Sequence, residues 1–290
     1  MMDLLSIKNL NVEFVQDQTA VKVVKGIDIR MHRGEVLAIV GESGSGKSVS
    51  MKALMGILPE NARVNADEIN FDGIELKNLS RKEMRMLRGN EIAMIFQDPM
   101  SALNPSKTIG AHLMEVIQRH QGRHGSKARE QAVEMLKKVG IPSAEKRMRQ
   151  YPHEFSGGMR QRVLIAMALC SKPKLLIADE PTTALDVTIQ AQILKLLKEL
   201  HETEGMDIIM ITHDLGVVAS IADRIAVMNR GEIVEVGSRE EVLYRPQHSY
   251  TKALIRAVPK CQRGERERLV SVADRYESKG TNEMAEKLRA

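Results

Sequence analysis

The sequence predicts an α/β protein whose core is a mainly parallel sheet covered by helices. Short apolar runs at 174–179 and 208–211 lie on either side of a segment, 189–200, in which apolar residues recur at helical spacing. Another apolar run, at 36–40, leads directly into a glycine-rich stretch and then a helix. Strands that alternate with helices in this way usually pair in parallel, because each helix carries the chain back across the sheet.

The remaining elements follow from periodicity. They are strands at 5–14, 21–31 and 69–73, helices at 109–117 and 128–139, and a hairpin at 227–234. Gly140 and Pro142 end the second of these helices. Beyond Pro259 the chain is charged and poor in apolar residues, which leaves open a loosely docked helix or a disordered tail.

Composition narrows the class of protein. The 290 residues are 43% hydrophobic, enough for a substantial core, and the net charge of +5 comes from well-mixed acids and bases. So mild a charge is a poor argument for nucleic-acid binding. Cys170 and Cys261 have no metal or disulfide spacing, which fits a reduced compartment. We expect neither a signal peptide nor a membrane span, so that another chain would supply any membrane crossing.

The glycine-rich stretch has the G-x-x-x-x-G-K-S spacing of a phosphate-binding loop. Its residues are Gly41, Glu42, Ser43, Gly44, Ser45, Gly46, Lys47 and Ser48. The glycines allow backbone N–H groups to surround an anion, and the following helix adds its dipole. Lys47 can reach the β- and γ-phosphates of a nucleotide, and the Ser48 hydroxyl can bind Mg²⁺. The strand, the spacing, the lysine and the serine together disfavour a glycine turn that only connects two elements.

Two predicted strands end in residues suited to phosphate chemistry. Asp179 is placed to hold Mg²⁺, and Glu180, one residue later, is placed to polarise an attacking water. The alternative is a pair of solvated acids. His213 follows the strand at 208–211, and parallel strands send their carboxyl ends to one edge, so we expect it near the γ-phosphate. A metal site at His120 and His124 is disfavoured, because that stretch has no apolar face.

Residues 155–162 (FSGGMRQR) resemble the signature sequence of ATP-binding cassette (ABC) ATPases. Gln97 matches the Q-loop of that family, Asp186 its D-loop and His213 its switch histidine. These motifs occur in the family's order, and the resemblance covers residues from about 5 to 258. Phe155 and Met159 depart from the usual signature, in a variant that peptide transporters often carry.

Wider stretches resemble one group within that family. They are 97–105, 151–154, 181–188 and 246–251, and they are similar to ATPase subunits of peptide, opine and nickel importers, above all dipeptide and oligopeptide permeases. The resemblance implies a cassette over 1–258 with an antiparallel N-terminal β subdomain, a helical subdomain inserted at about 98–170, and a charged tail at 259–290.

The resemblance also implies roles for particular residues. Glu180, His213, Lys47 and Gln97 would act in catalysis, and Ser48, Gln97 and Asp179 would hold Mg²⁺. Ser156, Gly157, Gly158 and Asp186 would contact nucleotide across a head-to-tail pair of cassettes. Phe14 either stacks on adenine or is a strand core residue. Some relatives bind an iron–sulfur cluster through several cysteines, but Cys261 stands alone, so we expect no cluster.

The resemblance implies a set of partners as well. ATP and Mg²⁺ would bind, and the second cassette would be a copy of this chain or a related ATPase. Permease subunits would dock near 97–104, and an extracytoplasmic solute-binding protein would complete the system. The protein would lie on the cytoplasmic face of the membrane.

A phosphate-binding loop alone is compatible with two other functions. A nucleic-acid-associated ABC ATPase is disfavoured, because residues 48–156 leave no room for long helices or zinc modules. A non-hydrolysing module is disfavoured by the complete set of Lys47, Asp179, Glu180 and His213.

Overall fold

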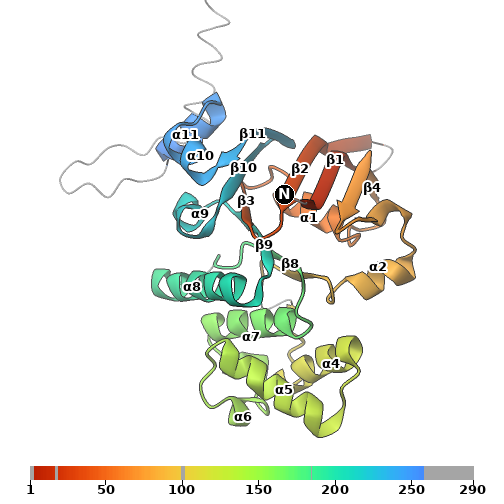
Figure 1. Cartoon of the computed structure of the whole chain (residues 1–290), viewed down its shortest axis with the longest axis vertical. Coiled ribbons are helices and arrows are strands. Elements are labelled where there is room, and N and C mark those ends of the chain that lie inside the picture. The colour runs from red at the N-terminus through yellow and green to blue at the C-terminus, as the bar shows by residue number, and fades with distance from the viewer. Residues whose placement is uncertain (1–2, 17–18, 99–101, 184, 258–290) are drawn as a thin grey trace, which may run out of the picture.

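The computed structural model describes residues 3–16, 19–98, 102–183 and 185–257 (Figure 1). Within these ranges, the larger sheet has six strands, in the order β11 (Glu232–Ser238), β10 (Arg224–Asn229), β3 (Val36–Val40), β9 (Asp207–Thr212), β8 (Leu175–Asp179) and β7 (Ile92–Ile95). Neighbouring strands are parallel except for the β10–β11 hairpin. The predicted mainly parallel core sheet is confirmed.

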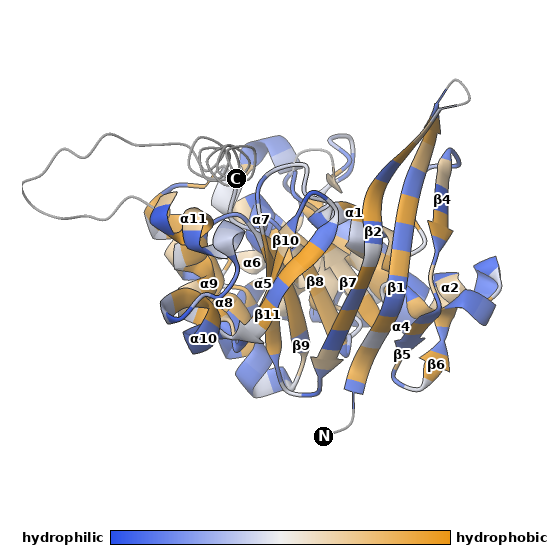
Figure 2. Ribbon diagram, turned by 90° about the horizontal axis from the view of Figure 1, so that it is seen from above, coloured by the Kyte–Doolittle hydropathy of each residue, from blue (hydrophilic) through white to orange (hydrophobic). Residues whose placement is uncertain are grey.

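The N-terminal region forms a second, antiparallel sheet. Its order is β2 (Thr19–His32), β1 (Asp3–Gln16), β5 (Glu68–Phe71) and β6 (Ile74–Glu75), with β4 (Ala62–Asn65) also paired to β1. Hydrophobic and hydrophilic bands alternate along β1 and β2 in Figure 2, because one face of each strand is buried and the other is not. The predicted antiparallel N-terminal strands are therefore confirmed.

The strands β3, β8 and β9 are buried on both faces, and this explains their continuous apolar runs. In β9, Ile208 and Met210 belong to the apolar cluster that includes residues of α7 (Gly157–Leu169) and α8 (Val187–Glu204), whereas Ile209 and Ile211 belong to the cluster beneath the N-terminal sheet. A third cluster joins Ala38 and Val40 of β3 to residues of α9 (Leu215–Ile221) and α11 (Ser249–Ala257).

Helices cover the sheets and form a group of their own (Figure 1). The helices are α1 (Lys47–Leu54), α2 (Arg81–Leu87), α4 (Ile109–Gln121), α5 (Gly125–Lys138), α6 (Ala144–Arg147), α7 (Gly157–Leu169), α8 (Val187–Glu204), α9 (Leu215–Ile221), α10 (Arg239–Tyr244) and α11 (Ser249–Ala257), with 3₁₀ turns at Leu76–Asn78 and Pro152–Glu154. The helices α4 to α7 lie between β7 and β8 in the chain. The predicted helices at 109–117 and 128–139 are confirmed as α4 and α5, and the hairpin as β10–β11.

Periodicity did not predict several short elements. The strands β4, β6 and β7 and the helices α2, α9 and α10 each have seven residues or fewer, too few to set a clear period. The domain limits stay a prediction, and residues 258–290 lie outside the described ranges. No helix in the described part of the chain combines the length and apolarity that crossing a bilayer requires.

Candidate nucleotide site

The phosphate loop joins β3 to α1 in a backbone shape that needs glycine. Gly41 has φ +154°, and a Cβ built on it would lie 2.0 Å from the carbonyl oxygen of Met228. Gly46 has φ +105° and caps α1 without a side-chain hydrogen bond to the first turn. The first N–H groups of α1 therefore have no capping side chain, which suits a site for an anion.

Lys47 is enclosed by the loop that it follows. Its ammonium group donates hydrogen bonds to the carbonyl oxygens of Gly41 at 2.9 Å and Glu42 at 2.7 Å. Burial lowers the pKa of the ammonium group, against the opposing effects of Glu180 and Asp179. None of the ion pairs found among the described residues includes Lys47, so a nucleotide phosphate fits the charge of this buried cation.

Asp179 ends β8 directly beside the start of α1. The Ser48 hydroxyl donates a hydrogen bond to its Oδ1 at 2.6 Å. The carboxyl group is 1% exposed, and this burial raises its pKa. A divalent cation would compensate the buried negative charge, and hydroxyl, carboxylate and amide oxygens are the donors that Mg²⁺ prefers. The described ranges contain no cluster of three or more His, Cys, Asp and Glu side chains, so any Mg²⁺ here would depend on Ser48 and Gln97 as well.

Glu180 connects the other predicted catalytic residues. Its Oε2 accepts a hydrogen bond from Gln97 Nε2 at 2.9 Å, and its Oε1 lies 3.2 Å from His213 Nδ1. Thr183, to which sequence reasoning gave no role, donates to the same Oε2 at 2.9 Å. The backbone of Glu180 is in the left-handed region, with φ +47°. This conformation costs free energy for any residue other than glycine, and such residues cluster at functional sites.

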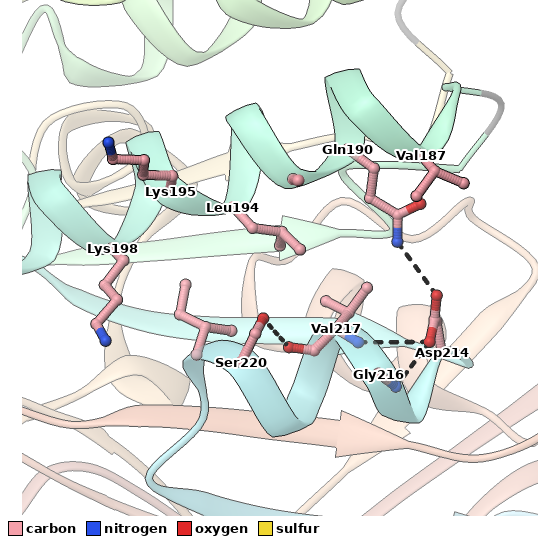
Figure 3. Close-up of a pocket in the computed structure, with 11 residues that line it drawn as sticks. Val187, Gln190, Leu194, Lys195, Lys198, Asp214, Gly216, Val217 and Ser220 are labelled. Carbon is pink, nitrogen blue, oxygen red and sulfur yellow. Dashed lines mark hydrogen bonds between the residues drawn. The ribbon is translucent and has the colours of Figure 1, made fainter. Parts of the chain in front are cut away.

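Asp186 and His213 are linked through the helices that follow them. Asp186 caps α8 by accepting the N–H of Ile189 at 2.9 Å. Gln190, one turn into α8, donates to the Asp214 carboxylate at 3.1 Å, and Asp214 caps α9. Figure 3 shows this contact at one end of a groove of about 460 Å³ between α8 and α9. Sequence reasoning gave no role to Gln190, four residues after Asp186, or to Asp214, directly after His213.

The signature residues lie in a different part of the fold. The Ser156 hydroxyl caps α7 by accepting the N–H of Met159 at 3.4 Å. A Cβ on Gly158 would lie 2.4 Å from Ile189 Cγ2, so glycine allows α7 to pack closely on α8. The helix α7 packs against α4, α5, α8 and β7, whereas α1 packs against β1 and β2. No hydrogen bond within the described ranges joins the signature to the phosphate loop.

Phe14 lies in β1, paired with Val21 on β2 and Ala62 on β4. Its side chain is partly buried against the apolar cluster beneath the N-terminal sheet. This contact is compatible with a strand core residue, and the adenine-stacking role stays a prediction.

A family model described as ABC transporter matches residues 24–183, which is more than half of the chain. The chain belongs to this family. A second model, described as the C-terminal region of oligopeptide/dipeptide transporters, matches residues 234–283. The chain is therefore an ATP-binding subunit of an ABC transporter, and its activity is ATP hydrolysis coupled to transport.

Curated relatives of this ABC subunit are similar over most of their length. The dipeptide transport ATP-binding protein DppD of Bacillus subtilis is 53% identical over 257 residues, covering 88% of this chain and 77% of the relative. The oligopeptide transport ATP-binding protein OppD of Bacillus subtilis is 52% identical, covering 93% and 75%. DppD of Escherichia coli is 50% identical, covering 93% and 83%.

Solved cassettes have the same fold. A dimeric, post-hydrolysis structure of the ATP-binding cassette MJ0796, bound to ADP and Pi, matches with a TM-score of 0.72 and 28% identity. The match covers 81% of this chain and 98% of that one. The ABC cassette fold expected from the motifs is confirmed.

Proposed function

We propose that this subunit hydrolyses ATP to drive uptake of short peptides or of related solutes such as opines or nickel chelates. One observation carries the hydrolytic part: Glu180 is hydrogen-bonded to Gln97 and lies beside His213, at the end of the strand whose Asp179 contacts Ser48. The solute class is supported by the relatives described above, which are dipeptide and oligopeptide transport proteins, and by the match at 234–283.

Hydrolysis requires positioning of a water and stabilisation of charge on the γ-phosphate. We assign the positive charge to Lys47 and the loop N–H groups. Glu180 orients or deprotonates the attacking water, and its contacts to Gln97 and Thr183 hold its carboxylate in place. His213 contacts the γ-phosphate from the neighbouring strand end.

Mg²⁺ would be held by Ser48, Gln97 and Asp179, and when bound it would neutralise charge on the phosphates. Asp179 is suited to this role because its carboxyl group is buried beside Ser48 without an ion-pair partner among the described residues. Gln97 is exposed, and its amide nitrogen donates to Glu180. This contact uses the nitrogen, and the amide oxygen is the atom that would bind Mg²⁺.

The complete site would need two cassettes. Ser156, Gly157, Gly158 and Asp186 would close on the nucleotide bound to the loop of a second cassette, a copy of this chain or a related ATPase. The dimeric state of the similar MJ0796 cassette supports this arrangement. ATP would favour the closed pair and hydrolysis the open one.

The remaining partners follow from the transport role. Permease subunits would dock near 97–104 and hold the chain at the cytoplasmic face of the membrane, and a solute-binding protein would deliver the solute from outside. The curated relatives described above are transport proteins, so nothing supports the nucleic-acid alternative.

The proposal is tested with Glu180→Gln, which keeps the shape of the side chain and removes its charge. We expect ATP binding to persist, hydrolysis to be nearly abolished, and a closed pair of cassettes to accumulate on size-exclusion chromatography with ATP. Glu199→Gln, on the exposed face of α8, is the matched control and should hydrolyse ATP normally. Normal turnover in Glu180→Gln would rule out the assigned role.

The transport role needs a separate measurement. Deletion of the gene that encodes this chain should abolish uptake of labelled dipeptides by the host, and re-expression of the gene should restore uptake. The chain should also co-purify with membrane permeases. Undiminished uptake of every peptide, opine and nickel chelate tested would contradict the proposed solute class.

A further inference from the structure

Tyr250 on α11 contacts the phosphate loop from the far end of the sequence. Its hydroxyl oxygen accepts a hydrogen bond from the backbone N–H of Glu42 at 3.1 Å. The side chain is 2% exposed and belongs to the same apolar cluster as Val40, the last residue of β3. The ring is therefore buried in the apolar cluster that includes the end of β3, and its hydroxyl contacts the loop itself.

Both backbone polar groups of Glu42 are hydrogen-bonded. Its N–H donates to Tyr250, while its carbonyl oxygen accepts a hydrogen bond from the Lys47 ammonium at 2.7 Å. Further along the loop, the carbonyl oxygen of Ser45 accepts the N–H of Gly231, in the β10–β11 turn, at 3.0 Å. The C-terminal part of the cassette thus contacts the loop at two points, Glu42 and Ser45.

The position of Tyr250 is itself fixed by β11. The Glu235 carboxylate on that strand accepts the backbone N–H groups of Gln247 at 2.7 Å and His248 at 3.1 Å, immediately before α11. Burial of Leu254 in the third cluster holds the next turn of the helix. These contacts leave the Tyr250 hydroxyl little freedom to follow a loop that changes shape.

From this geometry we propose that Tyr250 is a positioning residue for nucleotide binding. Its hydroxyl fixes the backbone N–H of Glu42, and through it the shape in which Lys47 and the loop N–H groups meet the phosphates. The inference rests on the proposed role of the loop. It extends the nucleotide site to α11, a helix that otherwise covers one side of the core sheet.

The test is Tyr250→Phe in the full chain, which removes the hydroxyl and keeps the ring. We expect the Kd for a non-hydrolysable ATP analogue, measured by calorimetry, and the KM for ATP to rise about three- to tenfold, the effect of losing one hydrogen bond. The kcat should stay within about twofold, because the hydroxyl does not touch the reacting groups. Tyr244→Phe removes the same atom from an exposed tyrosine on α10 and should change neither constant.

Hydrogen exchange supplies a second readout. The amide of Glu42 should exchange slowly in the parent protein and faster in Tyr250→Phe, while amides of β8 and β9 keep their rates. An unchanged affinity, or a lower melting temperature with unchanged affinity and unchanged exchange at Glu42, would overturn the inference. Loss of hydrolysis in Glu180→Gln tests the proposed function independently, so a silent Tyr250→Phe beside an inactive Glu180→Gln would count against Tyr250 alone.

Discussion

The strand-end cluster and the signature differ in what one chain supplies. In the strand-end cluster, side chains from four segments contact one another: Ser48 contacts Asp179, and Glu180 contacts Gln97 and His213. In the signature, Ser156 contacts only the helix that it begins, among the hydrogen bonds of the described residues. The hydrolytic groups are thus preassembled within one chain. The signature is a capped helix end, and no hydrogen bond among the described residues joins it to the phosphate loop that would hold the nucleotide.

This difference indicates that the two regions respond differently to substitution. Residues of the strand-end cluster should matter to a single chain, since their contacts lie within it. Apart from their packing and capping contacts within α7 and α8, signature residues should affect hydrolysis only when a second cassette closes, because no hydrogen bond among the described residues joins them to the phosphate loop.

The largest effect is expected for Lys47→Ala. Removing the buried ammonium group deletes positive charge beside the phosphates, so ATP affinity of the isolated chain should be lost and hydrolysis should fall by at least about 100-fold. Lys195→Ala, on the exposed face of α8, is the matched control and should retain both. Calorimetry and phosphate release measure the two quantities, and retained affinity in Lys47→Ala would remove the loop from the account.

A pair of substitutions at Ser156 should sharpen the contrast. Asp and Asn both cap helices as well as Ser does, so Ser156→Asp and Ser156→Asn should unfold at nearly the parent temperature. The carboxylate would repel a phosphate, so Ser156→Asp should lose hydrolysis by about tenfold or more relative to Ser156→Asn. Both should bind ATP as isolated chains like the parent. Equal hydrolysis by the two variants would restrict Ser156 to a capping role.

Asp179→Asn should separate stability from function. Burial raises the pKa of this carboxyl group above its ordinary 3.8, so the folded state opposes its ionisation. The resulting loss of stability is absent below pH 3.8, grows as the pH rises to the folded-state pKa, and is fully present above that pKa. The amide should therefore melt at or above the parent temperature at pH 7 without nucleotide, while losing the further stabilisation that Mg²⁺ gives with ATP. A lower melting temperature at pH 7, with parent-like stability at pH 4, would contradict this electrostatic reasoning.

The smallest effect concerns Cys170, which follows α7 at the end remote from the signature. Burial raises the pKa of its thiol to about 12, so almost no thiolate is present at pH 8. In a Cys261→Ser background, native protein should resist iodoacetamide for hours and react within minutes in urea. Mass spectrometry measures the label, and rapid native labelling would show that the end of α7 opens readily.

Sequence reasoning predicted the parts of this molecule that have strong local signals. The loop, the strand ends at Asp179 and His213 and the helices α4, α5 and α8 each combine a clear period with a recognisable boundary. Contacts between distant segments could not be predicted in this way. Thr183 on Glu180, Gln190 on Asp214 and Tyr250 on Glu42 depend on how strands and helices pack, and no local pattern records that packing.

The central claim is that the signature of one cassette completes the nucleotide site of another. A structure of the Glu180→Gln protein closed with ATP in its transporter tests this most directly. The account predicts ATP phosphates on Lys47 and the loop of one cassette, with Ser156 and Gly157 of this chain against the nucleotide bound to the opposing cassette. A closed, ATP-loaded assembly in which Ser156 still faces only α7 and solvent would contradict it.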